Sequence, residues 1–166
     1  MSGPDSVHVP GLGTFRHEVD RSYGGPVGGP YGELVLVSWE AELDRRGEQV
    51  KLSLYEDGSP LSPEEVTRAG QRMLAFLERE ESARREVATA LLDLAGDWWA
   101  ARGDEVSETP LTVETFLGLM RLEAVVAEEE DQLTVYYDDD GEVFAGHAIQ
   151  AVFGVDGTLI NTDIPG

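Results

Sequence analysis

The spacing of apolar residues changes twice along the chain, and this change constrains the fold more than any other feature of the sequence. In residues 49–55 apolar and polar side chains alternate, as they do in a strand with one buried face. In residues 62–101 the apolar side chains recur every three or four positions, as on an amphipathic helix. Alternation returns after residue 122. Over a length of 166 residues, this order predicts a single α+β domain spanning residues 1–166.

The N-terminal third predicts a β-hairpin. Two apolar-rich segments, 33–39 and 49–55, flank a turn in which Gly47 provides the positive φ that such turns require. A first short strand is expected over residues 12–19. The segment from Tyr23 to Pro30 is rich in glycine and proline, so we expect a loop there.

Residues 62–101 predict two antiparallel helices that are separated near Glu80. Ser62 and Glu65 have the spacing of a capping box, and proline is tolerated at the first helical position between them. Thr112 is expected to begin a short third helix. After these helices, strands at 122–127, 132–137 and 142–153 form a meander, followed by a short terminal segment at 158–164. The expected fold is an antiparallel sheet made from the N-terminal hairpin and this meander, with the helices between them in sequence.

The formal charge of the chain is −21, and its distribution is uneven. The last 45 residues contain 11 acidic residues and no lysine or arginine. Such a segment repels nucleic acids and anionic membranes, and it attracts basic partners. The same acidity would also serve solubility or adaptation to a salty host. We predict a partner-binding acidic surface built from the two acid-rich turns: Glu128, Glu129, Glu130, Asp131, Asp138, Asp139, Asp140 and Glu142.

The composition argues against a metal site or a bound cofactor. The chain has no cysteine, which rules out disulfides and cysteine-based zinc sites. Residues 138–142 resemble part of a calcium-binding loop, but with Gly141 at the sixth position the twelfth position falls on His147 instead of glutamate. With neither a signal peptide nor a long apolar run, the chain is expected to be cytoplasmic.

His147, Trp98 and Trp99 are the candidates for a pocket. Alternation within the predicted strand 142–153 places His147 on a mostly apolar face, so we expect it to be partly buried and structural, with a role as general base as the alternative. Gly146 before it would serve a bulge or a close approach. Trp98 and Trp99 project about 100° apart on a helix, so they cannot both lie at the centre of one buried stripe. We expect a core position for both, one of them at its edge, with an exposed tryptophan that anchors an interface as the alternative. No catalytic residue is assigned.

The second half of the chain resembles a family of small uncharacterised bacterial proteins. The resemblance is carried by Tyr136-Tyr137-Asp138-Asp139, Gly146-His147-Ala148-Ile149 and Trp98-Trp99. Some proteins of this kind look as if they are encoded beside polymorphic toxins, where a small acidic partner neutralises a secreted effector. Related sequences tend to carry an aromatic residue immediately before Gly-His, whereas this chain has Ala145. The resemblance implies no catalytic residues.

Together these features predict a protein-interaction module and not an enzyme. The first hypothesis is an immunity protein whose acidic C-terminal surface blocks the basic active site of a cognate toxin. The alternatives are a nucleic-acid mimic that inhibits a DNA-binding protein and an enzyme that uses His147 with a nearby carboxylate.

Overall fold

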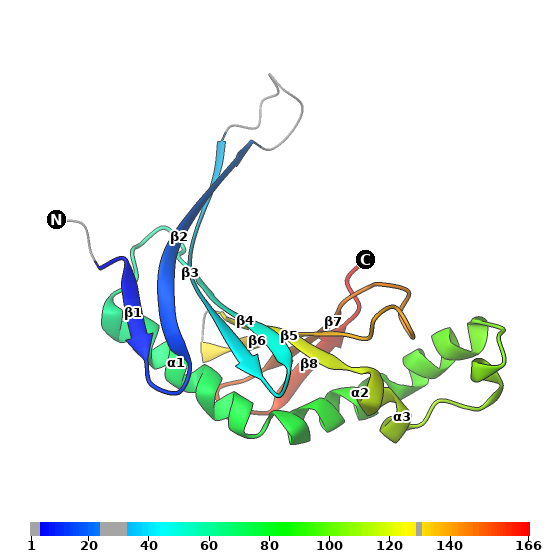
Figure 1. Ribbon diagram of the computed structural model, residues 1–166. Helices are drawn as coiled ribbons and strands as arrows, with labels where there is room; N and C mark the ends of the chain where they lie inside the picture. Colours follow the sequence, from blue (N-terminus) through cyan, green and yellow to red (C-terminus); the bar gives the residue numbers. More distant parts are fainter. Residues whose placement is uncertain (1–3, 24–32, 129–130) are drawn as a thin grey trace.

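The computed structural model describes residues 4–23, 33–128 and 131–166. Their strands form one eight-stranded sheet (Figure 1). The order of the strands in the sheet is their order in the chain. The predicted α+β class is therefore confirmed, including the N-terminal hairpin and the C-terminal strands. The strands are β1 (Ser6–Val9), β2 (Gly13–Tyr23), β3 (Glu33–Arg45), β4 (Glu48–Tyr55), β5 (Arg121–Ala127), β6 (Leu133–Asp138), β7 (Ile149–Phe153) and β8 (Leu159–Asp163).

One neighbouring pair of strands, β4 and β5, is parallel, and the others are antiparallel. All described helices lie in the connection between these two strands, and a connection that crosses one face of a sheet returns the chain in the same direction. The expected sheet was antiparallel throughout, so it differs from the structure at this pair. The helices are α1 (Pro63–Glu78), α2 (Glu80–Ala101), the 3₁₀ turn η1 (Val106–Glu108) and α3 (Val113–Leu119).

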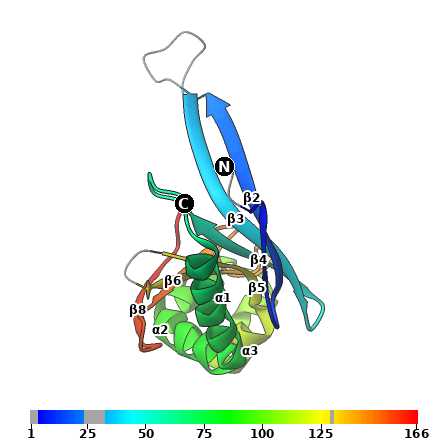
Figure 2. The same ribbon diagram turned by 90° about the vertical axis from the view of Figure 1, so that its left-hand side faces the viewer.

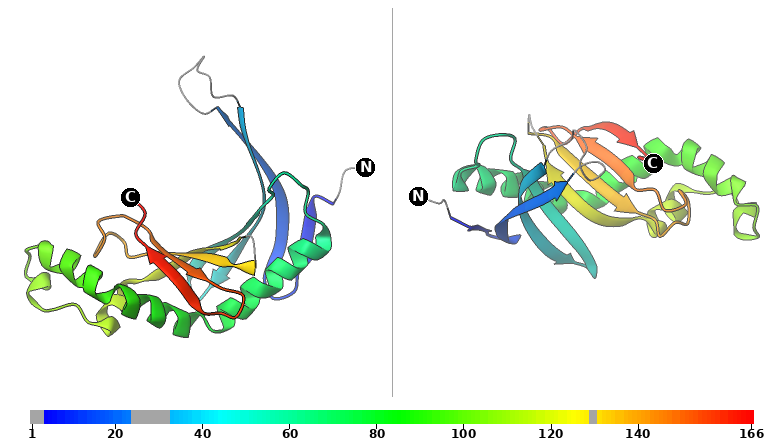
Figure 3. Two further views of the ribbon diagram at one scale, coloured as in Figure 1. Left: turned by 180° about the vertical axis from the view of Figure 1, so that it is seen from behind. Right: turned by 90° about the horizontal axis from the view of Figure 1, so that it is seen from above.

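Helix α1 begins as predicted. The Ser62 hydroxyl accepts a hydrogen bond from the Glu65 amide at 3.2 Å, and the Ser62 amide donates to the Glu65 carboxylate at 2.7 Å. The prediction that α1 and α2 are antiparallel is wrong. A single residue, Arg79, separates them, which is shorter than an antiparallel helix pair requires, and the two helices run end to end beneath the sheet (Figures 1 and 3).

The hydrophobic core lies between the helices and one face of the sheet. The alternating residues Val50, Leu52 and Leu54 of β4 are buried there, as their spacing requires. Contact between α1 and β1 is close enough that a Cβ atom at Gly70 would lie 2.9 Å from the Val9 side chain. Strand β1 was not predicted from the sequence. Its four residues are too short to establish a clear alternation.

A buried ionic cluster attaches the β3–β4 turn to α2. Glu80, almost wholly buried, accepts hydrogen bonds from Arg84 at 2.8 Å and from Arg45 at 3.1 Å. Arg84 also pairs with Glu48 at 3.3 Å. The Tyr137 hydroxyl is buried near this cluster and makes no hydrogen bond of good geometry to the described residues. Its burial, and secondly the charge of Glu80, raises the pKa of Tyr137 well above the ordinary value.

The other face of the sheet is not covered by any of the described helices (Figures 1 and 2). Strands β2 and β3 also extend beyond the rest of the sheet as a two-stranded arm, residues 19–23 and 33–37, which pair only with each other within the sheet. The glycine-rich segment predicted as a loop falls mainly on residues 24–32, outside the described residues. No helix in the described part of the chain is long and apolar enough to cross a membrane.

The predicted strand 142–153 is too long at its N-terminal end, because β7 begins only at Ile149. Residues 139–148 form a loop instead. Ala145 and Gly146 have φ angles of 53° and 91°, which are incompatible with a regular strand. Gly146 therefore serves neither a bulge nor a close approach, since a Cβ atom there would meet nothing within 4 Å. Its positive φ explains the glycine.

Candidate functional site

The predicted acidic surface is divided between the two ends of β6. Glu128 and Asp131 lie at one end, and Asp138, Asp140 and Glu142 lie at the other. The strand itself separates the two groups by about 17 Å, at about 3.3 Å per residue. Glu129 and Glu130 lie outside the described residues. The two turns therefore do not form one continuous surface, because successive turns of an antiparallel meander lie at opposite ends of the strands.

Arginines from distant parts of the chain neutralise much of these turns. Arg72 of α1 pairs with Asp131 at 3.2 Å, and Arg102 pairs with Glu142 at 3.0 Å. Arg121 pairs with both Asp138 and Asp140 at 2.7 Å, and these contacts, the hydrogen bond to Asp138 first, raise the pKa of Arg121. The C-terminal segment is free of bases in sequence but not in space.

Asp139 does not belong to the surface to which the sequence assigned it. Its side chain is wholly buried, and its carboxylate accepts hydrogen bonds from the amides of Gly141, Val143 and Phe144 at 2.9, 3.2 and 2.9 Å. The prediction that Asp139 is an exposed partner-binding residue is therefore wrong. The carboxylate organises the loop over residues 139–148 from inside, because buried amides require acceptors.

The structure brings together two of the three residues of the predicted pocket. The Trp98 ring contacts the rings of Phe144 and His147 edge-on, at centroid distances of 5.5 and 5.7 Å. Trp98 is 36% exposed. Trp99 is buried on another side of α2, where its Nε1 donates to the carbonyl of Thr109 at 2.9 Å. A core position for both tryptophans therefore holds for Trp99, whereas Trp98 lies at the surface.

His147 is partly buried, as predicted, and its backbone amide donates a hydrogen bond to the carbonyl oxygen of Phe144 at 3.0 Å. Within the described residues its side chain pairs with no carboxylate. The histidine that does is His17, whose Nε2 lies 3.4 Å from Glu56 Oε1. The same oxygen accepts from Trp39 Nε1 at 3.0 Å and from the Leu61 amide at 3.1 Å. Sequence reasoning missed this group because its members come from separate segments; the cross-strand register of His17 and Trp39 would have been the only signal.

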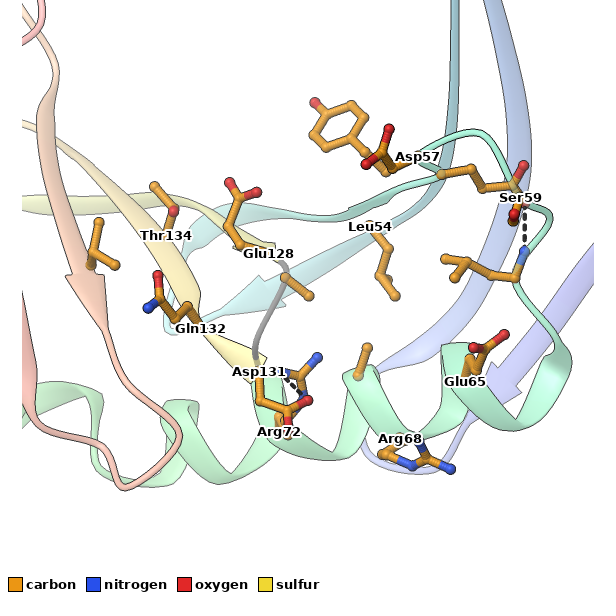
Figure 4. Close-up of a pocket in the computed structure, with 16 residues that line it drawn as sticks. Leu54, Asp57, Ser59, Glu65, Arg68, Arg72, Glu128, Asp131, Gln132 and Thr134 are labelled. Carbon is orange, nitrogen blue, oxygen red and sulfur yellow. Dashed lines mark hydrogen bonds and ion pairs between the residues drawn. The ribbon is translucent and has the colours of Figure 1, made fainter.

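A pocket of about 920 Å³ lies where the parallel strands β4 and β5 end (Figure 4). Its walls are the loop after β4, the first turns of α1 and the residues flanking the β5–β6 connection. Two bases line the pocket, Arg68 and Arg72, and Arg72 forms an ion pair with Asp131. The acids outnumber these bases, which favours a cationic group over an anion. The acidic lining residues are Glu56, Asp57, Glu65, Glu128 and Asp131.

This pocket opens onto the uncovered face of the sheet, which we call the open face. Cross-strand pairs place seven acidic and three basic strand residues on this face within the described part of the chain. Ser53, Val126 and Thr134 form a buried floor, with Tyr136 beside them. Burial first, and then the nearby charge of Glu128, raises the pKa of Tyr136. The charged residues are Glu18, Asp20, Glu40, Glu42, Asp44, Asp138, Asp163, Arg16, Lys51 and Arg121.

Nothing in the described part of the chain groups three His, Asp or Glu side chains as a metal site would. Residues 32–164 match the sequence pattern of DUF2262, described as an uncharacterized protein conserved in bacteria. The chain belongs to this family. The resemblance to a bacterial family of unknown function is thus confirmed. The match to DUF2262 spans β3 to β8, with the pocket and Trp98, and excludes β1 and β2. No curated protein and no solved structure matches the chain.

Proposed function

We propose that this protein is a binding module for a basic protein and acts as an immunity protein that neutralises a bacterial toxin. The observation that carries the proposal is the open face, an uncovered sheet surface with seven acidic and three basic strand residues among those described. Helices on the opposite side already enclose the core, so this acidic face is not needed to bury apolar residues.

The arm extends the same surface and supplies apolar contacts. Leu36 is 44% exposed and lies on the open face with Asp20 opposite it, whereas Val19 and Val35, which are 49 and 44% exposed, face the other side of the arm. A two-stranded ribbon is only marginally stable alone. Large apolar side chains exposed on such a ribbon are typical of a surface that a partner covers.

The binding surface of this proposal is the open face and not the Asp-rich turns. Arg72, Arg102 and Arg121 already neutralise acids of those turns. Glu18 and Asp20 of β2 face the same side as Glu40 and Glu42. Glu40 pairs with Lys51 at 3.1 Å, but the acidic residues of this side outnumber its bases, so their fields add. A surface of one sign accelerates association with a basic partner by steering it before contact.

The test is binding to the product of the neighbouring open reading frame, measured as association rates at low and high salt. The double variant Glu18→Lys, Asp20→Lys should slow association at least about tenfold at low salt and much less at high salt. A matched control, Glu105→Lys with Glu108→Lys, changes the net charge equally at exposed residues of the η1 region. If the neighbouring protein does not bind, or if both double variants slow association equally, the proposal fails.

A nucleic-acid mimic is the second candidate, favoured by the row of carboxylates on β3. Glu40, Glu42 and Asp44 face the same side at steps of about 6.6 Å, and a regular row of charges imitates a row of phosphates. A mimic should bind several unrelated DNA-binding proteins and compete with DNA for each. An immunity protein should bind one cognate toxin and ignore the others.

A further inference from the structure

The second half of α2 carries an apolar stripe that the sheet does not cover. Ala90, Leu94, Trp98 and Ala101 are exposed to solvent and fall on one side of the helix, since residues four and eight apart share a face. Leu94 is 43% exposed. The helix extends here past the edge of the sheet and beneath the loop over residues 139–148 (Figure 1).

The stripe continues onto that loop. Trp98, Ala101, Val143 and Ala145 line a shallow depression of about 470 Å³, together with the ion pair between Arg102 and Glu142. The edge-on contacts of Trp98 with Phe144 and His147 hold the indole in one orientation. A partly exposed tryptophan that is already fixed loses little entropy on binding, which makes it an effective interface anchor.

Acidic residues border the stripe without being neutralised. Glu86, Asp93 and Asp97 of α2 make no ion pair with any of the described residues, unlike the acids of the turns, and all are exposed. With about 100° of rotation per residue, they project on the side of the stripe next to Ala90, about 20–60° around the helix axis from it. An apolar stripe edged by unpaired carboxylates complements an amphipathic helix whose apolar face is flanked by lysine or arginine.

We propose that the stripe Ala90, Leu94, Trp98 and Ala101 is a second docking surface, and that its occupant is a basic amphipathic helix of the protein partner. The inference rests on the proposed function only for the identity of that partner. The docking chemistry follows from the stripe itself: apolar contact at Leu94 and Trp98, and ionic contact along the edge formed by Asp93 and Asp97.

The first test uses a synthetic peptide of leucine and lysine, about 18 residues or five turns long, arranged as an amphipathic helix. A scrambled peptide of the same composition is its control. Trp39 and Trp99 are only 3 and 5% exposed, so acrylamide quenching of the native protein reports mainly on Trp98. The amphipathic peptide should protect this fluorescence from quenching, and the scrambled peptide should not.

The variant Leu94→Asn should weaken peptide binding at least about tenfold, and its exposed position makes it compatible with folding, which urea unfolding checks. The matched control is Val155→Asn in the turn between β7 and β8, an exposed valine outside both the stripe and the open face, which should leave peptide binding unchanged. Equal protection by both peptides, or equal binding by wild type and Leu94→Asn, would overturn the inference.

The two proposals fail separately. If Leu94→Asn binds the neighbouring-gene product normally while Glu18→Lys, Asp20→Lys does not, the second surface is wrong and the proposed function stands. If the neighbouring-gene product does not bind at all but the peptide protects Trp98 in the manner described, the proposed function is wrong and the docking chemistry of the stripe stands.

Discussion

Replacing Asp139 with alanine should detach the loop over residues 139–148 from the core. The Asp139 carboxylate is the acceptor for the Val143 and Phe144 amides, which are both buried, and for the partly buried Gly141 amide. Alanine leaves these donors without a partner. The loop would then have to open to water, which also exposes the Phe144 ring that is now buried against Trp98.

The expected cost follows from the two buried amides. A hydrogen bond to a charged acceptor contributes about 1.5–3 kcal/mol, and a buried donor without a partner costs a similar amount. Two such donors therefore lower the free energy of unfolding by about 3–6 kcal/mol in Asp139→Ala. Asp139→Asn retains one carbonyl oxygen as an acceptor, so its loss should be about half as large.

Urea unfolding followed by far-ultraviolet circular dichroism measures this free energy, and acrylamide quenching measures the exposure of Trp98. The matched control is Asp138→Ala, which removes the neighbouring carboxylate and its ion pair with the half-exposed Arg121. Such an exposed pair contributes about 1 kcal/mol or less. If the two alanine variants lose the same stability, or if Trp98 is quenched no more in Asp139→Ala than in wild type, the assignment of Asp139 as the organiser of this loop is wrong.

Three further predictions concern packing, buried charge and pH. Gly70→Ala should destabilise the protein, because the new Cβ atom would collide with β1. Gly96→Ala has open space around it and should stabilise the protein by up to about 1 kcal/mol. Urea unfolding measures both variants, and equal changes in stability would contradict this prediction. Glu80→Gln should cost about 3 kcal/mol, because it removes the ion-pair partner of the partly buried Arg45 and leaves Arg84 with Glu48 alone. The exposed Glu81→Gln should cost under about 0.5 kcal/mol, and equal losses would refute the buried pairing. Folding raises the pKa of Tyr137, so the contribution of this group to stability is present below the ordinary pKa of about 10 and is lost as the pH rises above it. The free energy of unfolding, measured at alkaline pH, should therefore fall less steeply with pH in Tyr137→Phe than in wild type. Parallel curves would contradict this prediction.

Local signals predicted the elements well because they act over a few residues. The capping box joins Ser62 to Glu65 within one turn, so no distant contact is needed for α1 to begin there. Gly47 follows the same logic, since its φ of 81° closes the β3–β4 turn as expected. The end-to-end arrangement of α1 and α2 was missed because helical periodicity gives the buried side of each helix but not its direction.

Asp138, Asp139 and Asp140 show most clearly where sequence reasoning stops. The three residues are identical and adjacent, and the sequence treated them as one exposed group. In the structure the outer two pair with Arg121, whereas Asp139 is buried beneath loop amides. Asp139 turns inward because the loop amides of Gly141, Val143 and Phe144 converge on it, and this convergence is a property of the folded loop that three identical neighbouring residues do not reveal.

The sequence by itself determined the α+β class, the hairpin, the start of α1 and the large net acidity, because these follow from periodicity, local capping and composition. Only the tertiary structure decided where the acidity acts. Arg72, Arg102 and Arg121 are brought to the turns by folding, while no helix in the described part of the chain covers the open face. Coulomb interactions depend on distance in space, and strand order and register, which set those distances, are properties of the assembled sheet.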